Sequence, residues 1–138
     1  MKTRLTISGT HLKELAAIAK SSLPNESCAL LAGHAKEMES WMDINVLEIL
    51  AARNADNSIL SFSIDEMELI DLYERAEDRG LQVVGIFHSH PSTPVPSSTD
   101  VEFMRINPVV WLIYSSITHE FRSYILAEDL EDVEIESA

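Results

Sequence analysis

The stretch Gly85–Asp100, with the sequence GIFHSHPSTPVPSSTD, ends an apolar run with two histidines two residues apart. In an extended segment such residues point to the same side, so His88 and His90 can reach one metal ion. Imidazole nitrogen suits zinc, and a catalytic zinc typically has three protein ligands and one position for water. Asp100 is the natural third ligand, because the N-terminus of a helix favours its ionised form. The stretch therefore predicts a zinc site, with a proline-stiffened loop between its ligands.

A second segment, Glu26–Gly33 (ESCALLAG), is nearly all apolar after its first residues, which is typical of an internal strand covered on both faces. Glu26 stands at its entrance, on the same pleat face as Cys28 and Leu30. A carboxylate that leads into a buried strand is costly unless it has a partner. A solvated acid at a strand end is the simpler alternative for Glu26. Cys28 is interpreted as a small buried residue rather than a reactive thiol.

The rest of the chain alternates between helical and strand patterns. Helices are expected over about residues 10–21, 64–79 and 100–106, and strands over about 3–8, 26–33, 37–52, 81–87, 109–114, 120–127 and 132–136. The sequence Ser63-x-x-Glu66 predicts a capping box for the second helix, and Thr99 is the expected cap of the third. Broken alternation from Leu47 onward indicates a bulge or bend. This order predicts an α/β sandwich with a mixed sheet, as one domain over residues 1–138.

Composition excludes several classes of partner. The formal net charge of −13 argues against nucleic acid and against anionic membrane surfaces. No apolar run is long enough to span a bilayer, and the first residues do not resemble a signal peptide. The single cysteine excludes an internal disulfide and fits a reducing compartment. We therefore expect a cytoplasmic protein that binds neither nucleic acid nor membranes.

Three features together resemble the JAMM (MPN-plus) metalloprotease family, in its minimal archaeal and bacterial form: an upstream Glu26, the sequence His88-x-His90-Pro91, and a following Ser97-x-x-Asp100. Segments 24–33 and 54–65 also resemble the family, so the resemblance covers essentially the whole chain. It implies a cytidine-deaminase-like α+β sandwich, with a mixed sheet flanked by helices.

The resemblance also implies a role for each site residue. His88, His90 and Asp100 are expected to bind Zn²⁺ together with a water molecule. Glu26 is expected to accept a proton from that water and deliver it to the leaving amine. Ser97 is expected to donate a hydrogen bond to the oxyanion. The six residues between His90 and Ser97 are one fewer than the family usually has. Ser98 restores that length but loses the spacing to Asp100, so both serines stay open, with Ser97 preferred.

The function implied first is that of a zinc isopeptidase or peptidase. It would act after the C-terminal Gly-Gly of a ubiquitin-like protein of the small archaeal-modifier type. A second hypothesis is a peptidase that trims a sulfur-carrier protein for cysteine or cofactor biosynthesis. A third is a non-enzymatic scaffold for protein–protein interaction. The expected partner is thus a ubiquitin-like or sulfur-carrier protein, and the chain is expected to be a monomer or a homodimer.

Overall fold

The computed structural model describes residues 2–56 and 63–137, which contain seven strands and three helices. The strands are β1 (Lys2–Ile7), β2 (Cys28–Glu37), β3 (Trp41–Ala52), β4 (Gln82–His90), β5 (Val110–Ser115), β6 (Phe121–Leu126) and β7 (Leu130–Ser137). The helices are α1 (Gly9–Ser22), α2 (Glu66–Asp78) and α3 (Ser98–Ile106). Within the described ranges, no helix is long and apolar enough to cross a membrane.

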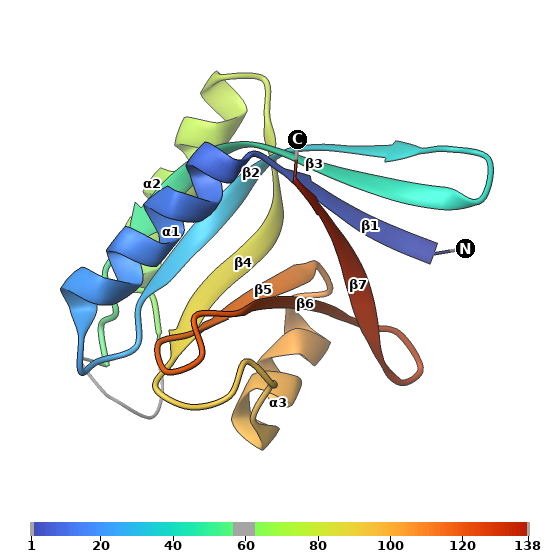
Figure 1. Cartoon of the computed structure of the whole chain (residues 1–138). Coiled ribbons are helices and arrows are strands. Elements are labelled where there is room, and N and C mark those ends of the chain that lie inside the picture. The colour runs from blue at the N-terminus through green and yellow to red at the C-terminus, as the bar shows by residue number, and fades with distance from the viewer. Residues whose placement is uncertain (1, 57–62, 138) are drawn as a thin grey trace.

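The strands form one mixed sheet in the order β1-β3-β2-β4-β5-β6-β7. The pairs β1–β3, β4–β5 and β1–β7 are parallel, and the other pairs are antiparallel. Because β7 pairs with β1, the sheet closes into a barrel, and Figure 1 shows β7 running toward the end of β1. The expected mixed sheet flanked by helices is confirmed. Its closure was not predicted.

The central strands carry apolar side chains on both faces. Alternate residues of β2 and β4, such as Leu31 and Phe87, pack into one core cluster with Leu15 and Ala19 of α1. The intervening residues of the two strands pack into a second cluster with side chains of α2 and α3. Its members include Cys28, Leu30 and Ala32 of β2, Ile86 of β4, Leu72 and Ala76 of α2, and Met104 of α3. The prediction of a strand covered on both faces is therefore confirmed for residues 28–33, whereas the rest of β2 is exposed. His88 follows Ile86 by two residues and so emerges on the α2–α3 face.

A β-bulge interrupts the pairing of β2 with β3. Ala32 lies opposite Glu48 and Gly33 lies opposite Val46, so Leu47 is the extra residue of β3. Leu47 is also 46% exposed, although it is large and apolar. The bulge predicted from the broken alternation is therefore confirmed.

We expect Gly33→Ala to lower the free energy of unfolding by about 1–3 kcal/mol, the usual range for overpacking. A Cβ at Gly33 would lie 1.8 Å from the backbone oxygen of Asn45, so the bulge would have to shift. Gly9→Ala is a suitable control, because its Cβ would meet Ser137 Oγ at an ordinary 3.6 Å. Urea unfolding measures both variants. Equal stability of Gly33→Ala and wild type would contradict the prediction.

Candidate metal centre

Three segments distant in sequence bring their polar side chains together. Cys28 of β2 lies opposite His88 of β4 in the antiparallel register, so Glu26 approaches the end of β4 that carries His90. The loop after β4 leads to α3, whose first turn carries Asp100. All four ionisable side chains are buried, from His88 at 0% exposure to His90 and Asp100 at 5%. The solvated-acid alternative for Glu26, which is 4% exposed, is wrong.

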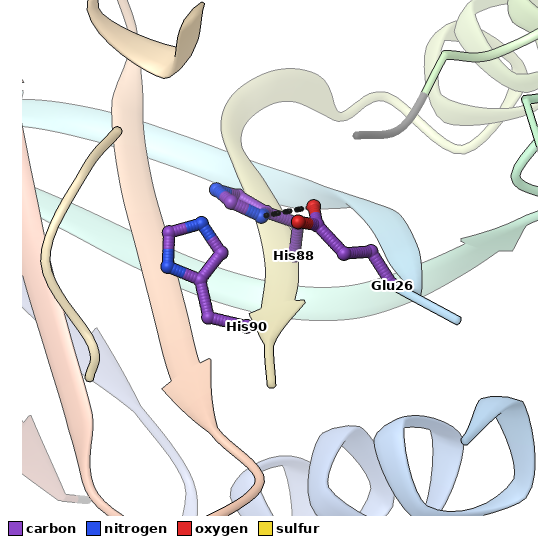
Figure 2. A group of neighbouring side chains, drawn as sticks. All are labelled: Glu26, His88 and His90. Atoms are coloured by element: carbon purple, nitrogen blue, oxygen red, sulfur yellow. Dashed lines mark ion pairs between the residues drawn. The ribbon is translucent and has the colours of Figure 1, made fainter. Parts of the chain in front are cut away.

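Glu26, His88 and His90 form a compact group (Figure 2). One ligand atom from each of the three lies within 4.8 Å of the others, as the ligands of one metal ion require. Glu26 Oε1 lies 3.3 Å from His88 Nδ1. This oxygen is buried and, apart from its ion pair with His88, has no polar partner among the described residues. A buried carboxylate oxygen in that state fits a site for a cation or for a water molecule.

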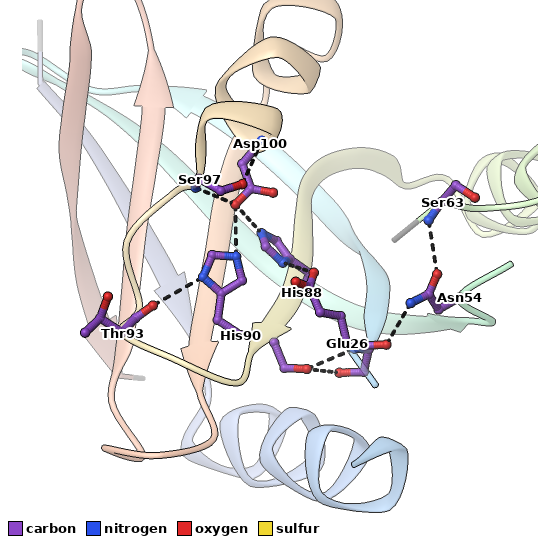
Figure 3. A network of polar contacts seen from close by, with 10 residues as sticks. Glu26, Asn54, Ser63, His88, His90, Thr93, Ser97 and Asp100 are labelled. Carbon is purple, nitrogen blue, oxygen red and sulfur yellow. Dashed lines mark hydrogen bonds and ion pairs between the residues drawn. The ribbon is translucent and has the colours of Figure 1, made fainter. Parts of the chain in front are cut away.

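Asp100 faces both histidines from the start of α3 (Figure 3). Its Oδ2 lies 3.0 Å from His90 Nε2 and 3.5 Å from His88 Nε2. His90 Nδ1 lies 3.2 Å from the Thr93 carbonyl oxygen, which can only accept, so Nδ1 is the donor. Nε2 of a neutral His90 then points a lone pair at a carboxylate oxygen, an arrangement that needs a proton or a cation between them. Two imidazoles and a carboxylate are a donor set that fits zinc.

The electrostatics of the site favour a bound cation. Burial tends to lower the pKa of His88, but Asp100 and Glu26 outweigh it and raise this pKa to about 9. Burial likewise tends to raise the pKa of Asp100. Contacts with His88 and His90 and the Ser97 N–H outweigh burial and hold this pKa well below its usual range. Asp100 is therefore a carboxylate at neutral pH, ready to bind a metal ion.

Ser97 caps α3 and holds Asp100 in place. Its hydroxyl accepts a hydrogen bond from Asp100 N at 3.1 Å, and its backbone N–H donates to Asp100 Oδ2 at 2.8 Å. These reciprocal bonds form a capping box, so the expected cap at Thr99 is wrong and the helix begins at Ser98. Since the Ser97 hydroxyl accepts this bond, its own hydrogen stays available for donation. Both Ser97 and Ser98 are exposed.

Sequence reasoning did not single out three further polar residues around the site. Asn54 Nδ2 donates to the Glu26 carbonyl at 3.0 Å, and Asn54 Oδ1 accepts from the backbone of Ser63 at 3.2 Å (Figure 3). Ser27 and Ser89 are buried and hydrogen-bonded to each other. One sequence signal could have pointed to the two serines. Each directly follows a candidate site residue next to an apolar run, Ser27 after Glu26 and Ser89 after His88.

Cys28 is expected to resist thiol reagents in the folded protein. Its side chain is fully buried, and burial, with the nearby charges of Glu68, Glu26 and Asp56, raises its pKa to about 12. The reactive thiolate is therefore scarce at neutral pH. Titration with a chromogenic disulfide should detect no thiol in the native protein and one per chain after unfolding in guanidinium. Rapid labelling of the native protein would contradict this.

Fold and site together define a class of protein: an α+β sandwich that brings a glutamate, two histidines and an aspartate into one buried cluster, in the JAMM order. The chain belongs to the family described as prokaryotic homologs of the JAB domain, whose model matches residues 9–126. The JAMM/MPN resemblance drawn from the sequence is thereby confirmed.

Curated relatives carry two names. A protein of Pyrococcus furiosus named desampylase is 43% identical over 84 residues, which are 60% of this chain and 59% of that protein. A desampylase of Haloferax volcanii is 33% identical over 111 residues, which are 77% of this chain and 71% of that protein. A CysO-cysteine peptidase of Mycobacterium tuberculosis is 27% identical over 128 residues, which are 90% of this chain and 84% of that protein.

Solved structures share the fold. A protein from Desulfitobacterium hafniense superimposes with a TM-score of 0.82 at 29% identity, over 97% of this chain and 92% of that one. A JAB1/MPN domain protein from Archaeoglobus fulgidus gives a TM-score of 0.56 at 20% identity, over 99% of this chain and 98% of that one. The second likeness shows the fold alone, and it confirms the expected MPN architecture.

Proposed function

We propose that this chain is a zinc-dependent isopeptidase that cleaves after the C-terminal Gly-Gly of a ubiquitin-like protein. The observation that carries the proposal is the convergence of Glu26 with His88, His90 and Asp100 in one buried cluster. In this proposal His88, His90 and Asp100 are the zinc ligands. Zinc, when bound there, makes water a nucleophile at neutral pH and polarises the scissile carbonyl.

The other side chains handle protons and charge. Glu26 accepts a proton from the attacking water and later delivers it to the leaving lysine amine, a role that contributes about 10²–10⁴-fold. The burial of its Oε1 next to His88 supports this role. The Ser97 hydroxyl donates a hydrogen bond to the oxyanion of the tetrahedral intermediate. The Ser97 hydrogen stays available for this, because the oxygen serves Asp100 N as an acceptor.

The proposed substrate class is a ubiquitin-like modifier of the small archaeal type. It is supported by the two archaeal relatives, which are both named desampylase. The mycobacterial relative named CysO-cysteine peptidase supports the second candidate, trimming of a sulfur-carrier protein by the same chemistry. We place the protein in the cytoplasm, a proposal that its single, buried, free cysteine supports.

A matched set of substrates tests the proposal. The zinc-loaded protein is incubated with one ubiquitin-like protein in three forms: joined through Gly-Gly to a lysine side chain, extended linearly beyond Gly-Gly, and joined to a single cysteine. Preferred release from lysine is the expected result. Preferred release of cysteine would favour the sulfur-carrier function, and no cleavage of any form would contradict peptidase activity.

Single alanine variants decide between the two serines. We expect Ser97→Ala to lower kcat by about 10²–10³-fold, as the loss of an oxyanion donor does. It also removes the cap of α3, which costs about 1 kcal/mol of stability. Ser98→Ala, one residue along, should keep near wild-type kcat. Steady-state kinetics, at a temperature below the onset of unfolding of both variants, measure the two kcat values. A larger loss of kcat in Ser98→Ala than in Ser97→Ala would assign the oxyanion donor to Ser98.

A further inference from the structure

Glu26 lies just outside the regular sheet. Strand β2 begins at Cys28, so Glu26 and Ser27 precede the β2 ladder, although Ser27 keeps one backbone hydrogen bond, in which Ser89 N donates to the Ser27 carbonyl. His88 and His90, in contrast, lie within β4 and pair with Ile113 and Ser115 of β5. The two halves of the site are therefore held by different means. Beyond that backbone bond, side-chain hydrogen bonds hold the segment that carries Glu26.

Two buried serines join the Glu26 segment to the histidine strand. Ser27 N donates to Ser89 Oγ at 2.9 Å, the two hydroxyl oxygens are 2.8 Å apart, and Ser89 N donates to the Ser27 carbonyl at 3.1 Å. Ser27 is 3% exposed and Ser89 is 2% exposed, so water does not compete for these bonds. Ser89 lies between His88 and His90 in sequence. The bonds thus tie the residue after Glu26 to the residue between the two histidines.

Asn54 holds the same segment at the neighbouring residue. Its Nδ2 donates to the Glu26 carbonyl at 3.0 Å, while its Oδ1 accepts from the backbones of Asp56 and Ser63. The Glu26 backbone is therefore bound to the loop after β3, and the Ser27 backbone is bound to β4. These contacts restrict the Glu26 backbone next to the histidines.

We propose that Ser27, Ser89 and Asn54 form a clamp that sets the position of the Glu26 carboxylate relative to His88 and His90. The inference rests on the proposed function, in which Glu26 is the general base. These three are positioning residues, because they act through the Glu26 backbone. Proton transfer requires hydrogen-bond reach, and a misplacement of about 1 Å can cost about 10²-fold in rate.

The clamp predicts a specific kinetic pattern for Ser89→Ala. We expect kcat to fall by about 10–100-fold, the usual effect of removing a supporting hydrogen bond. KM and zinc content should stay unchanged, since the histidines remain in the ladder with β5. In a Glu26→Gln background, Ser89→Ala should cause no further loss, because the base that it positions is already gone. Ser27→Ala removes only the hydroxyl–hydroxyl bond, so it should give a smaller fall and serves if Ser89→Ala fails to fold.

Ser123→Ala is the matched control. Ser123 is also 2% exposed and donates to a backbone carbonyl, that of Val133, at 2.8 Å, but it joins β6 to β7. It should keep wild-type kcat. Amide hydrogen exchange supplies a readout that needs neither zinc nor activity. The Ser27 amide should exchange at least about tenfold faster in Ser89→Ala than in wild type, and at the wild-type rate in Ser123→Ala.

Two results would overturn the clamp. One is a Ser27 amide as protected in Ser89→Ala as in wild type. The other concerns the Glu26→Gln background. If Ser89→Ala lowers the residual rate of Glu26→Gln by the same factor as it lowers the wild-type rate, the substitution damages the site in general and does not act through Glu26. If the wild-type protein cleaves no conjugate, the proposed function fails, and the exchange of the Ser27 amide alone decides whether the clamp holds the Glu26 segment.

Discussion

Glu26→Gln is expected to lower kcat by about 10²–10⁴-fold while zinc remains bound, because the amide cannot accept the proton from the attacking water. The substitution keeps the size of the side chain, so the packing next to His88 is preserved. Steady-state kinetics on a ubiquitin-like conjugate, with the zinc content of the same preparation, measure both parts of the prediction. KM should change little, since the interaction lost is made in the transition state.

Glu39→Gln is the control variant. It removes an exposed carboxylate in the turn between β2 and β3 and should leave kcat unchanged. Unaltered kcat in Glu26→Gln would exclude Glu26 as the general base. Loss of zinc from Glu26→Gln would instead make Glu26 a ligand, an arrangement that its place in the compact group with His88 and His90 also permits.

Asp100→Ala is expected to abolish zinc binding and reduce activity to the detection limit, with a further loss of stability. The carboxylate is the proposed third ligand, and its Oδ2 also accepts the Ser97 N–H that closes the capping box. Loss of that bond should cost about 1 kcal/mol in the zinc-free protein. Metal analysis measures the first effect. Urea unfolding in the presence of a chelator measures the second.

Asp100→Asn separates the two roles of this residue. Its amide oxygen can still accept from Ser97 N, whereas a neutral amide is a poor replacement for a carboxylate ligand. We expect Asp100→Asn to lose zinc and activity like Asp100→Ala, but to keep most of the cap on α3. Full zinc occupancy in both variants would contradict the assignment of Asp100 as a ligand.

The two histidines and the helix start that carries Asp100 were predictable from short-range rules, whereas the approach of Glu26 depends on the pairing of β2 with β4 and was implied only by the family resemblance. Alternation along β4 places His88 and His90 on one side, and the Ser97-x-x-Asp100 spacing places the aspartate in the first turn of a helix. The positions of Ser27, Ser89 and Asn54 were not predictable, since each depends on which strands and loops become neighbours. Closure of the barrel by β7 and β1 depends on the same long-range pairing.

The helix starts show where local rules fail. The first helix was expected to begin after Thr10, but its cap is Ser8, whose hydroxyl accepts from His11 N. The second was expected to begin after Ser63, but Asp65 is the cap. Ser63 Oγ instead donates to Asp56. Each start offers several residues with similar capping preference within a few positions, and tertiary contacts decide among them.

Titration of zinc into metal-stripped protein, with cleavage of a ubiquitin-like protein–lysine conjugate recorded at each addition, tests whether this chain is a zinc-dependent isopeptidase. We expect no cleavage without zinc, and a rate that rises linearly and reaches its maximum at one zinc per chain. Cleavage that persists in the stripped protein, or a chain that holds one zinc and leaves the conjugate intact, would contradict this expectation.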